Sequence, residues 1–302
     1  PYMGRGLITN TNKIFYGPTY VNIFFYNKCN ILDHRFNFRS NPELSQALLP
    51  SINSIISSSF DPDAKTVITI HSHGEDVTGN FNAFIVNAHL EAENVNILAV
   101  DWSRASSMYT EGLANTEQVG KVIADFINIL SINFSYFPSE IRIVGVGLGA
   151  HIAGIAGRNV IGDLPHIYAI DPSLHGWSHN PNILTKDDAT IVEVLHATAG
   201  ILGYDLPLGD LDFYPNGGTY QFGCGVDSNC SHIYAYAFYA ESITRAPGAN
   251  EFVGTKCESY EEAIAQECSG EKDVVFGGLE SKAGKSGIYS FKTNMVPPFA
   301  QG

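Results

Sequence analysis

Two hydrophobic patterns alternate along the chain. Short runs of β-branched and aromatic residues, typical of buried strands, occupy 14–26, 65–70, 95–100, 141–144, 166–170 and 191–195. Apolar residues at helical spacing predict helices over 80–93, 116–130 and 149–158. Residues 44–56 are expected to form at most one irregular helix around Pro50, because proline interrupts helical hydrogen bonding. Strands that alternate with helices through short connections predict a mostly parallel central sheet with helices on both faces.

The same pattern favours a single domain over residues 1–302. No internal repeat, low-complexity tract or linker-like stretch interrupts the chain before about residue 245. Residues 270–302 are richer in glycine and lysine and predict an irregular tail, within which 284–291 is expected to form one last strand.

Composition narrows the class of protein. With 44% hydrophobic and 16% charged residues, the 302-residue chain has the material for a large core, which excludes intrinsic disorder. The 17 Lys+Arg against 31 Asp+Glu give a net charge of −14, so we expect no nucleic-acid partner. No run of 18 apolar residues is present, so we expect no transmembrane segment.

Five cysteines indicate an oxidising compartment. Four of them lie as two short-range pairs in the last third of the chain, and none has the Cys-x-x-Cys spacing common in cytosolic zinc sites. We expect two local disulfides and a secreted, extracellular protein. Cys29 is left over, so pairing between chains, and with it self-association, stays open. The residues of the two pairs are Cys224, Cys230, Cys257 and Cys268.

Two sequences match the signal for N-glycosylation. Asn133 begins Asn-Phe-Ser and is predicted to be glycosylated. Asn229 begins Asn-Cys-Ser and is a poorer acceptor, because Cys230 is expected to be in a disulfide.

The segment 141–158, IRIVGVGLGAHIAGIAGR, carries the candidate chemistry. A buried strand runs through three alternating glycines directly into a helix of small residues. This is the layout of a nucleophile elbow, G-x-S-x-G, in which a sharp turn exposes the central residue, here Gly147, above the sheet. The backbone N–H of Leu148, at the helix N-terminus, would then face the site as an oxyanion donor. A dinucleotide-binding loop would need G-x-G-x-x-G, which this segment lacks.

The chain resembles the pancreatic-lipase family of the α/β-hydrolase superfamily, including its insect members. The resemblance rests on GxxLGAHxAGxAGR in the segment above and covers roughly residues 14–270. Four further motifs follow the family's order. They are VITIHSHGE (67–75), similar to the family's Ile-His-Gly loop, VNILAVDW (95–102), HIYAIDPSLHGW (166–177), and DFYPNGG (212–218) followed by CSHIYAYAFYAESI (230–243).

The resemblance implies an α/β-hydrolase fold and assigns the site. Asp171 falls at the position of the catalytic acid and His232 at that of the general base. The backbone amides of Leu148 and His73 fall at the oxyanion donors. Gly147 stands where the family has its nucleophilic serine, and no other G-x-S-x-G occurs in the chain.

Each assignment has an alternative that the residues alone favour. Asp171 precedes Pro172, and Asp-Pro commonly opens a turn. One histidine among ten is more often structural than catalytic. His71 and His73, two residues apart, are a candidate metal pair, but no third ligand accompanies them.

Glycine at position 147 removes the chemistry while keeping the fold. A triad needs a hydroxyl to attack the ester carbonyl, so without a side chain no acyl-enzyme forms. Glycine also tolerates the strained backbone of an elbow better than any other residue.

The resemblance also leads to expectations about a lid over the site, a bound metal and a second domain. Only five residues separate Cys224 from Cys230, so a long helical lid is excluded, and Cys257 with Cys268 matches a second family disulfide. The calcium-site segment is only partly kept around Asp187-Asp188, so we expect no metal and no cofactor. The family's separate C-terminal β-sandwich is expected to be absent.

Two functions from different classes follow. The first is a secreted, catalytically inactive lipase homologue, similar to insect yolk proteins in its loss of serine. It would store nutrient or bind lipid, or another hydrophobic small molecule, in a remnant acyl pocket. The alternative is an active triacylglycerol lipase or phospholipase A1. Its native serine would have been replaced deliberately by Gly147, or its nucleophile displaced to another residue such as Ser173 or Ser178.

Overall fold

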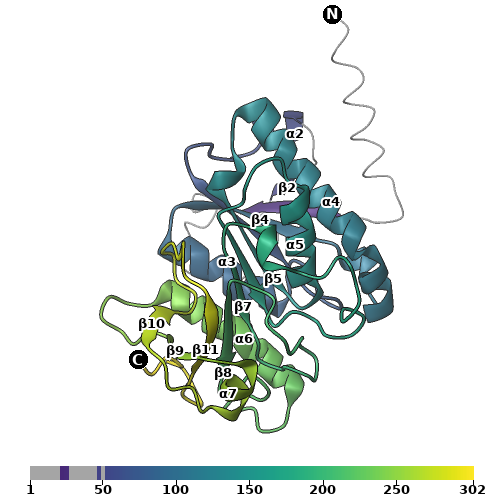
Figure 1. Cartoon of the computed structure of the whole chain (residues 1–302). Helices are drawn as coiled ribbons and strands as arrows, with labels where there is room; N and C mark the ends of the chain where they lie inside the picture. The colour runs from purple at the N-terminus through teal and green to yellow at the C-terminus, as the bar shows by residue number, and fades with distance from the viewer. Residues whose placement is uncertain (1–20, 27–45, 49–51) are drawn as a thin grey trace, which may run out of the picture.

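One sheet runs through the described part of the chain. The computed structural model describes residues 21–26, 46–48 and 52–302. Within them, eleven strands are hydrogen-bonded in the order β10-β9-β11-β8-β7-β6-β5-β3-β4-β1-β2 (Figure 1). The strands are β1 (Asn22–Tyr26), β2 (Gln46–Leu48), β3 (Lys65–Ile70), β4 (Val95–Asp101), β5 (Ile141–Val146), β6 (His166–Ile170), β7 (Val192–Leu195), β8 (Leu211–Pro215), β9 (Val253–Cys257), β10 (Lys272–Val275) and β11 (Gly287–Phe291).

The centre of the sheet is parallel and its edges are antiparallel. Strands β4, β3, β5, β6, β7, β8 and β11 pair in parallel. Strand β1 runs antiparallel to both β4 and β2 at one edge, and β9 runs antiparallel to β11 and β10 at the other. The predicted mostly parallel sheet is therefore confirmed.

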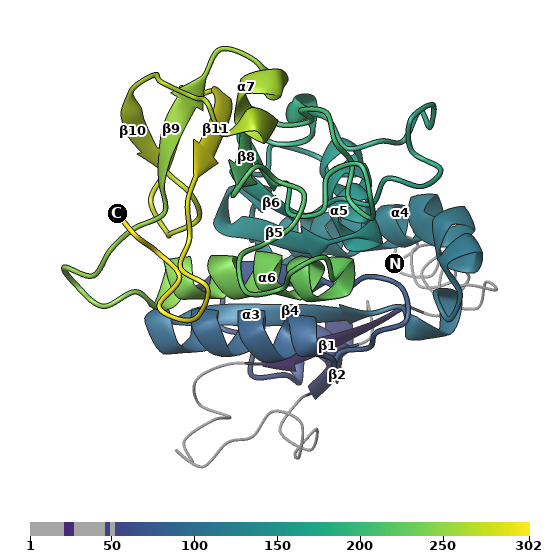
Figure 2. The same cartoon turned by 90° about the horizontal axis from the view of Figure 1, so that it is seen from below.

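Helices cover both faces of this sheet. Helices α4 (Tyr109–Phe134) and α5 (Leu148–Asn159) pack on one face, and α3 (Asn80–Ala92) and α6 (Ser228–Thr244) lie side by side on the other (Figure 2). The remaining described helices are short: α2 (Ile52–Ile56), α7 (Tyr260–Ala265), η4 (Ser103–Ala105), η5 (Pro138–Glu140) and η6 (Lys186–Asp188). None of the described helices is both long and apolar enough to cross a membrane.

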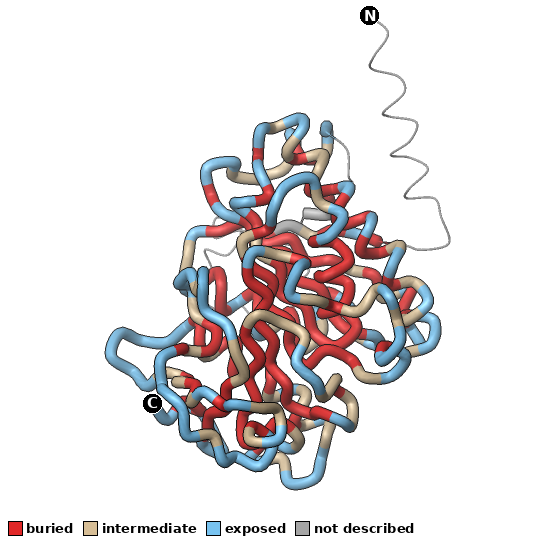
Figure 3. The backbone as a smooth tube through the Cα atoms, in the orientation of Figure 1, coloured by how far each residue is buried: buried red, intermediate tan, exposed pale blue. Residues whose placement is uncertain are grey.

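The burial of the central strands explains why they could be predicted from the sequence. All five residues of β6 are buried, and β3 is buried after its first residue. Because both faces of the central strands are covered, they need continuous apolar runs rather than alternation. Figure 3 shows the buried backbone concentrated in the sheet and in the helix turns that face it.

Three sequence predictions are corrected by the structure. Within 44–56, Gln46–Leu48 forms a strand against β1, and the helix is confined to Ile52–Ile56. A short edge strand is specified by its partner across the sheet and leaves little periodic pattern of its own. Helix α4 begins at Tyr109, seven residues before the predicted start at 116. The tail after residue 270 is partly regular, because β10 and β11 extend the sheet.

Two further predictions fall partly outside the described residues. Of the strand region predicted over 14–26, only residues 21–26 are described, and they contain β1. Cys29 also lies outside the described residues. The last strand predicted within 284–291 is confirmed as β11.

Candidate active site

Gly147 lies at the junction of β5 and α5, with φ 58° and ψ −118°. This left-handed backbone is strained for any residue with a side chain, and it is a natural place for glycine. The flanking glycines have a different reason to be present. A Cβ on Gly145 would lie 2.3 Å from the carbonyl oxygen of Gly149, and a Cβ on Gly149 would lie 2.1 Å from that of Ile70. The segment therefore adopts the tight strand-to-helix turn that its sequence predicts.

Asp171 follows β6 directly and is almost fully buried. Its carboxylate accepts hydrogen bonds from the backbone N–H groups of Ala197 and Thr198, at 2.8 and 2.9 Å. The Thr198 hydroxyl donates to it as well, at 2.5 Å. Asp171 has a positive φ of 45°, which aspartate tolerates better than most residues. The carboxylate is thus fixed by the 197–198 loop after β7.

His232, in the first turns of α6, is part-buried and pairs with the buried Asp171. Its Nδ1–H donates to Asp171 Oδ2 at 2.7 Å. Burial lowers the pKa of His232. The hydrogen bond to Asp171 and the negative charges of Asp171 and Glu75 raise it by more, so the pKa lies above the ordinary value of 6.5. Burial raises the pKa of Asp171, and the contacts with His232 and Thr198 reverse this and hold it below 3.8. The ring's other nitrogen, Nε2, has no hydrogen-bond partner among the described residues.

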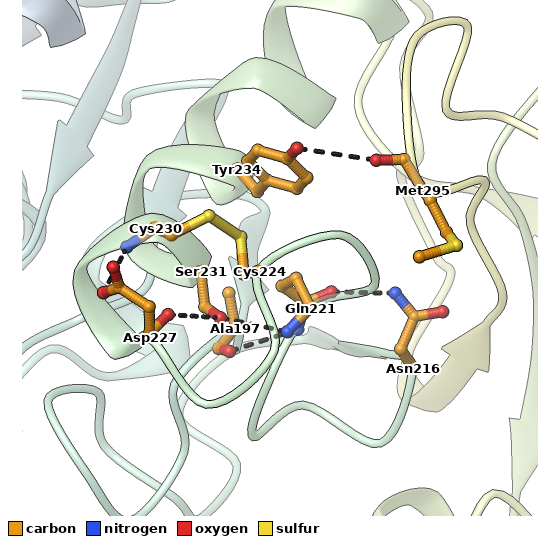
Figure 4. Close-up of a disulfide and its surroundings, with 9 residues drawn as sticks. All are labelled: Ala197, Asn216, Gln221, Cys224, Asp227, Cys230, Ser231, Tyr234 and Met295. Carbon is orange, nitrogen blue, oxygen red and sulfur yellow. Dashed lines mark hydrogen bonds between the residues drawn. A yellow bond between two sulfur atoms is a disulfide. The ribbon is translucent and has the colours of Figure 1, made fainter.

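A polar cluster beneath the Cys224–Cys230 disulfide anchors the start of α6 (Figure 4). The Asp227 side chain caps the helix by accepting from the N–H of Cys230. Ser231 Oγ accepts from the N–H of Gln221 at 3.0 Å. The Gln221 amide in turn donates to the carbonyl of Ala197, whose own N–H holds Asp171. The histidine and the carboxylate are therefore positioned through one connected network.

The loop after β3 lies over the elbow. Ser72 Oγ accepts the N–H of Leu148 at 3.3 Å, so the predicted oxyanion amide already has a partner. The ring of His73 packs edge-to-face on Tyr109, with centroids 4.9 Å apart. His71 is fully buried and does not line the cavity beside His232; its Nδ1–H donates to the carbonyl of Ser72 and its Nε2 accepts from the N–H of Trp102. His71 and His73 thus do not converge as a metal pair.

A cavity of about 430 Å³ opens beside His232. Its size suits a small ligand or part of an acyl chain. Burial raises the pKa of the Glu75 carboxyl at its wall, against the opposing charges of His71 and His232. The lining residues are Ser72, His73, Glu75, Asn80, Tyr109, Val146, Ser173, His175, Leu202, Asn229, His232, Ile233 and Tyr236.

Several of these residues escaped the sequence analysis. Ser72 and Glu75 lie inside a motif that was recognised, but no spacing rule marks either of them as functional. Tyr109 begins α4, which follows β4, and it reaches the cavity only because β3, β4, β5 and β6 are neighbours in the sheet. It could therefore have been identified only after the fold had been assigned.

The structure also describes the predicted disulfide and glycosylation positions. Both predicted disulfides, Cys224–Cys230 and Cys257–Cys268, are present. Asn133 is exposed on α4, and its glycosylation stays a prediction.

Asp188, in the segment that resembles the family's calcium site, is paired with an arginine. Both carboxylate oxygens of Asp188 accept hydrogen bonds from the Arg158 guanidinium, at 2.9 and 2.7 Å. No group of three metal-ligating side chains occurs among residues 21–26, 46–48 and 52–302.

Comparisons with known proteins identify the family of the chain. A family model described as lipase matches residues 24–280. Pancreatic triacylglycerol lipase of Myocastor coypus is 31% identical over 280 residues, covering 84% of this chain and 60% of the relative. Inactive pancreatic lipase-related protein 1 of Canis lupus familiaris is 34% identical over 256 residues, covering 76% and 54%. Dienelactone hydrolase from Anabaena variabilis ATCC 29413, a solved structure, aligns with a TM-score of 0.33 at 10% identity, over 60% of this chain and 70% of its own. The chain spans little more than half the length of the two lipase relatives.

Proposed function

The chain belongs to the lipase family and has its α/β-hydrolase fold, and from this premise we propose that it is a catalytically inactive member. In this proposal it binds lipid, or another hydrophobic small molecule, in the cavity beside His232. Its role is that of an extracellular yolk or nutrient-storage protein of the insect type.

The observation that carries the proposal is the backbone at Gly147. The elbow keeps the geometry that would present a nucleophile, yet the residue there has no side chain. Asp171 and His232 remain paired at 2.7 Å, so a base has been retained without a hydroxyl to deprotonate at position 147. In an ester hydrolase of this type, loss of the nucleophile removes most of the rate enhancement.

The cavity supports a binding role. Val146, Leu202, Ile233 and Tyr236 give it apolar walls, and His232 with Ser72 adds polar groups to the lining. Apolar walls with a few fixed polar groups are the usual composition of a small-molecule site. The two disulfides support an extracellular setting, because such bonds persist in oxidising compartments.

One observation favours the alternative, an active ester hydrolase with a displaced nucleophile. Two hydroxyls flank Gly147: its Cβ, if present, would lie 2.4 Å from Ser72 Oγ and 3.4 Å from Ser173 Oγ. Neither hydroxyl is hydrogen-bonded to His232 in the described part of the chain, so neither has the base that a nucleophile needs.

Solvent extraction of the purified natural protein, followed by mass spectrometry, tests the binding role. We expect about one lipid per chain, with p-nitrophenyl butyrate turnover at the level of the no-protein control. Ile233→Asp should lower the bound lipid about tenfold, because a charge replaces an apolar wall of the cavity.

Ile264→Asp is the matched control. Ile264 has nearly the same exposure, 39% against 36%, but lies on α7 and does not line the cavity. Equal lipid content in both variants, or no lipid in the natural protein, would contradict the binding role. Turnover that His232→Ala removes would favour the displaced nucleophile.

A further inference from the structure

Ser72 fills the space that a side chain at position 147 would need. Strands β3 and β5 are neighbours, so the loop after β3 and the elbow after β5 meet at the same edge of the sheet. A Cβ on Gly147 would lie 2.4 Å from Ser72 Oγ and 2.9 Å from Ser72 Cβ. Both separations are below 3.0 Å, which real Cβ contacts essentially never show. The two residues therefore share one site, with room for one side chain.

The Ser72 hydroxyl also takes the place of an oxyanion. It accepts the N–H of Leu148 at 3.3 Å, and its other partner is His73 Nδ1 at 3.4 Å. Burial and the nearby His232 lower the pKa of His73, so its ring is neutral and can accept from the hydroxyl. A carbonyl oxygen that developed charge near Leu148 would have to displace Ser72 first.

The Ser72 loop is held in place from behind. Its carbonyl accepts from His71 Nδ1–H at 2.7 Å. Trp102, fully buried, donates from Nε1 to the carbonyl of His71 at 2.9 Å. Gly74 donates its N–H to the carbonyl of Ser106 at 3.0 Å. Because the backbone on both sides of Ser72 is bonded, the loop cannot withdraw cheaply to admit a second side chain.

We propose that Ser72 and Gly147 form an exchanged pair that keeps a latent ester-hydrolase centre closed. Restoring serine at position 147 alone is then insufficient, because the new side chain meets Ser72 and the oxyanion amide stays occupied. Exchanging both residues opens the centre. This inference rests on the proposed absence of turnover in the natural chain.

The reaction that the exchange would release is ester hydrolysis. The hydroxyl introduced at position 147 attacks the ester carbonyl, and His232 Nε2 takes its proton. The Leu148 N–H, freed from Ser72, stabilises the oxyanion. The carbon–oxygen bond to the leaving alcohol breaks, the alcohol takes the proton from His232, and water releases the acid from the acyl-enzyme.

Five proteins test the proposal: the natural chain, Gly147→Ser, Ser72→Gly, the double variant Ser72→Gly/Gly147→Ser, and Ser72→Ala/Gly147→Ser. We expect the double variant with glycine at position 72 to hydrolyse p-nitrophenyl butyrate about 100-fold faster than Gly147→Ser, because one occupied oxyanion donor costs that much in acyl transfer. His232→Ala in this background should abolish the gain. The variant with alanine at position 72 should be intermediate, since it keeps the Cβ that would lie 2.9 Å away.

Each outcome bears on the proposal. Equal rates for Gly147→Ser and the double variant would overturn it, as would a folded double variant with no activity. Turnover by the natural chain that Ser72→Gly removes would overturn both this inference and the proposed function. If neither the natural chain nor Ser72→Gly/Gly147→Ser hydrolysed the ester, this inference would be overturned and the proposed function would stand.

Thermal unfolding of the same proteins gives a second readout that does not need activity. We expect Gly147→Ser to lower the Tm by about 5 °C, and Ser72→Gly to recover at least half of that loss in the double variant. Strictly additive losses at the two positions, or failure of the double variant alone to fold, would show that the side chains do not compete and would overturn the proposal.

Discussion

Gly149→Ala is expected to abolish accumulation of folded protein. The new Cβ would lie 2.1 Å from the carbonyl oxygen of Ile70 and 2.8 Å from that of His71. Both atoms are backbone, and Ile70 belongs to β3, which pairs with β4 and β5 in the centre of the sheet. No rotamer change can relieve such an overlap, so we expect a loss of about 4 kcal/mol or more in the free energy of unfolding.

Gly284→Ala is the matched control for this substitution. Gly284 has a positive φ of +80°, which Gly149 does not, but a Cβ at Gly284 would have nothing within 4 Å. We expect a loss of about 1 kcal/mol, from backbone strain alone. Soluble yield and thermal unfolding compare the two. A Tm of Gly149→Ala within a few degrees of that of Gly284→Ala would contradict the close contact between helix α5 and strand β3.

Asp171→Ala is expected to cost about 3 kcal/mol even though the chain has no nucleophile at position 147. The substitution leaves two buried backbone N–H groups and the Thr198 hydroxyl without their acceptor. His232→Ala should cost only about 1 kcal/mol, because the ring is 24% exposed and Asp171 keeps its other donors. This asymmetry would explain why the acid–histidine pair is present in a chain that has no side chain at position 147.

The pH dependence of the stability lost in Asp171→Ala follows from the pKa shifts of Asp171 and His232. The pKa of Asp171 is depressed, so the stability it contributes is present above its ordinary pKa of 3.8 and is lost as pH falls through the lower folded value. The pKa of His232 is raised, so its contribution is present below 6.5 and is lost as pH rises through the higher folded value. The Tm difference between the natural chain and Asp171→Ala should therefore be greatest between about pH 4 and 6.5. A Tm difference that grew steadily from pH 6 to pH 2 would be inconsistent with a charged pair between Asp171 and His232.

The sequence predicted the centre of the fold better than its edges. Strands such as β3 and β6 are buried on both faces, and this leaves continuous apolar runs that can be recognised without a structure. Strands β2 and β10 form the two edges of the described sheet and pair with one strand each, and β9 lies beside β10. Their sequences carry little periodicity, so they were missed or misassigned.

The candidate site was also predicted only in part. The resemblance to the lipase family assigned Gly147, Asp171 and His232 to one site, and the structure places Asp171 and His232 in contact. The part played by Ser72 could not be predicted, because it depends on a distance between atoms 75 residues apart along the chain. Nor could the pairing of Asp188 with Arg158, which depends on how η6 packs against α5.

Intact mass spectrometry after incubation with a fluorophosphonate tests the central claim most directly, because this reagent labels serines that a neighbouring base has activated. The claim is that the chain retains the acid–histidine pair of a lipase without an activated nucleophile. We predict that the mass of the natural chain stays unchanged. A single adduct that appears on the natural chain and disappears in His232→Ala would contradict the claim, and peptide mapping would identify the serine responsible.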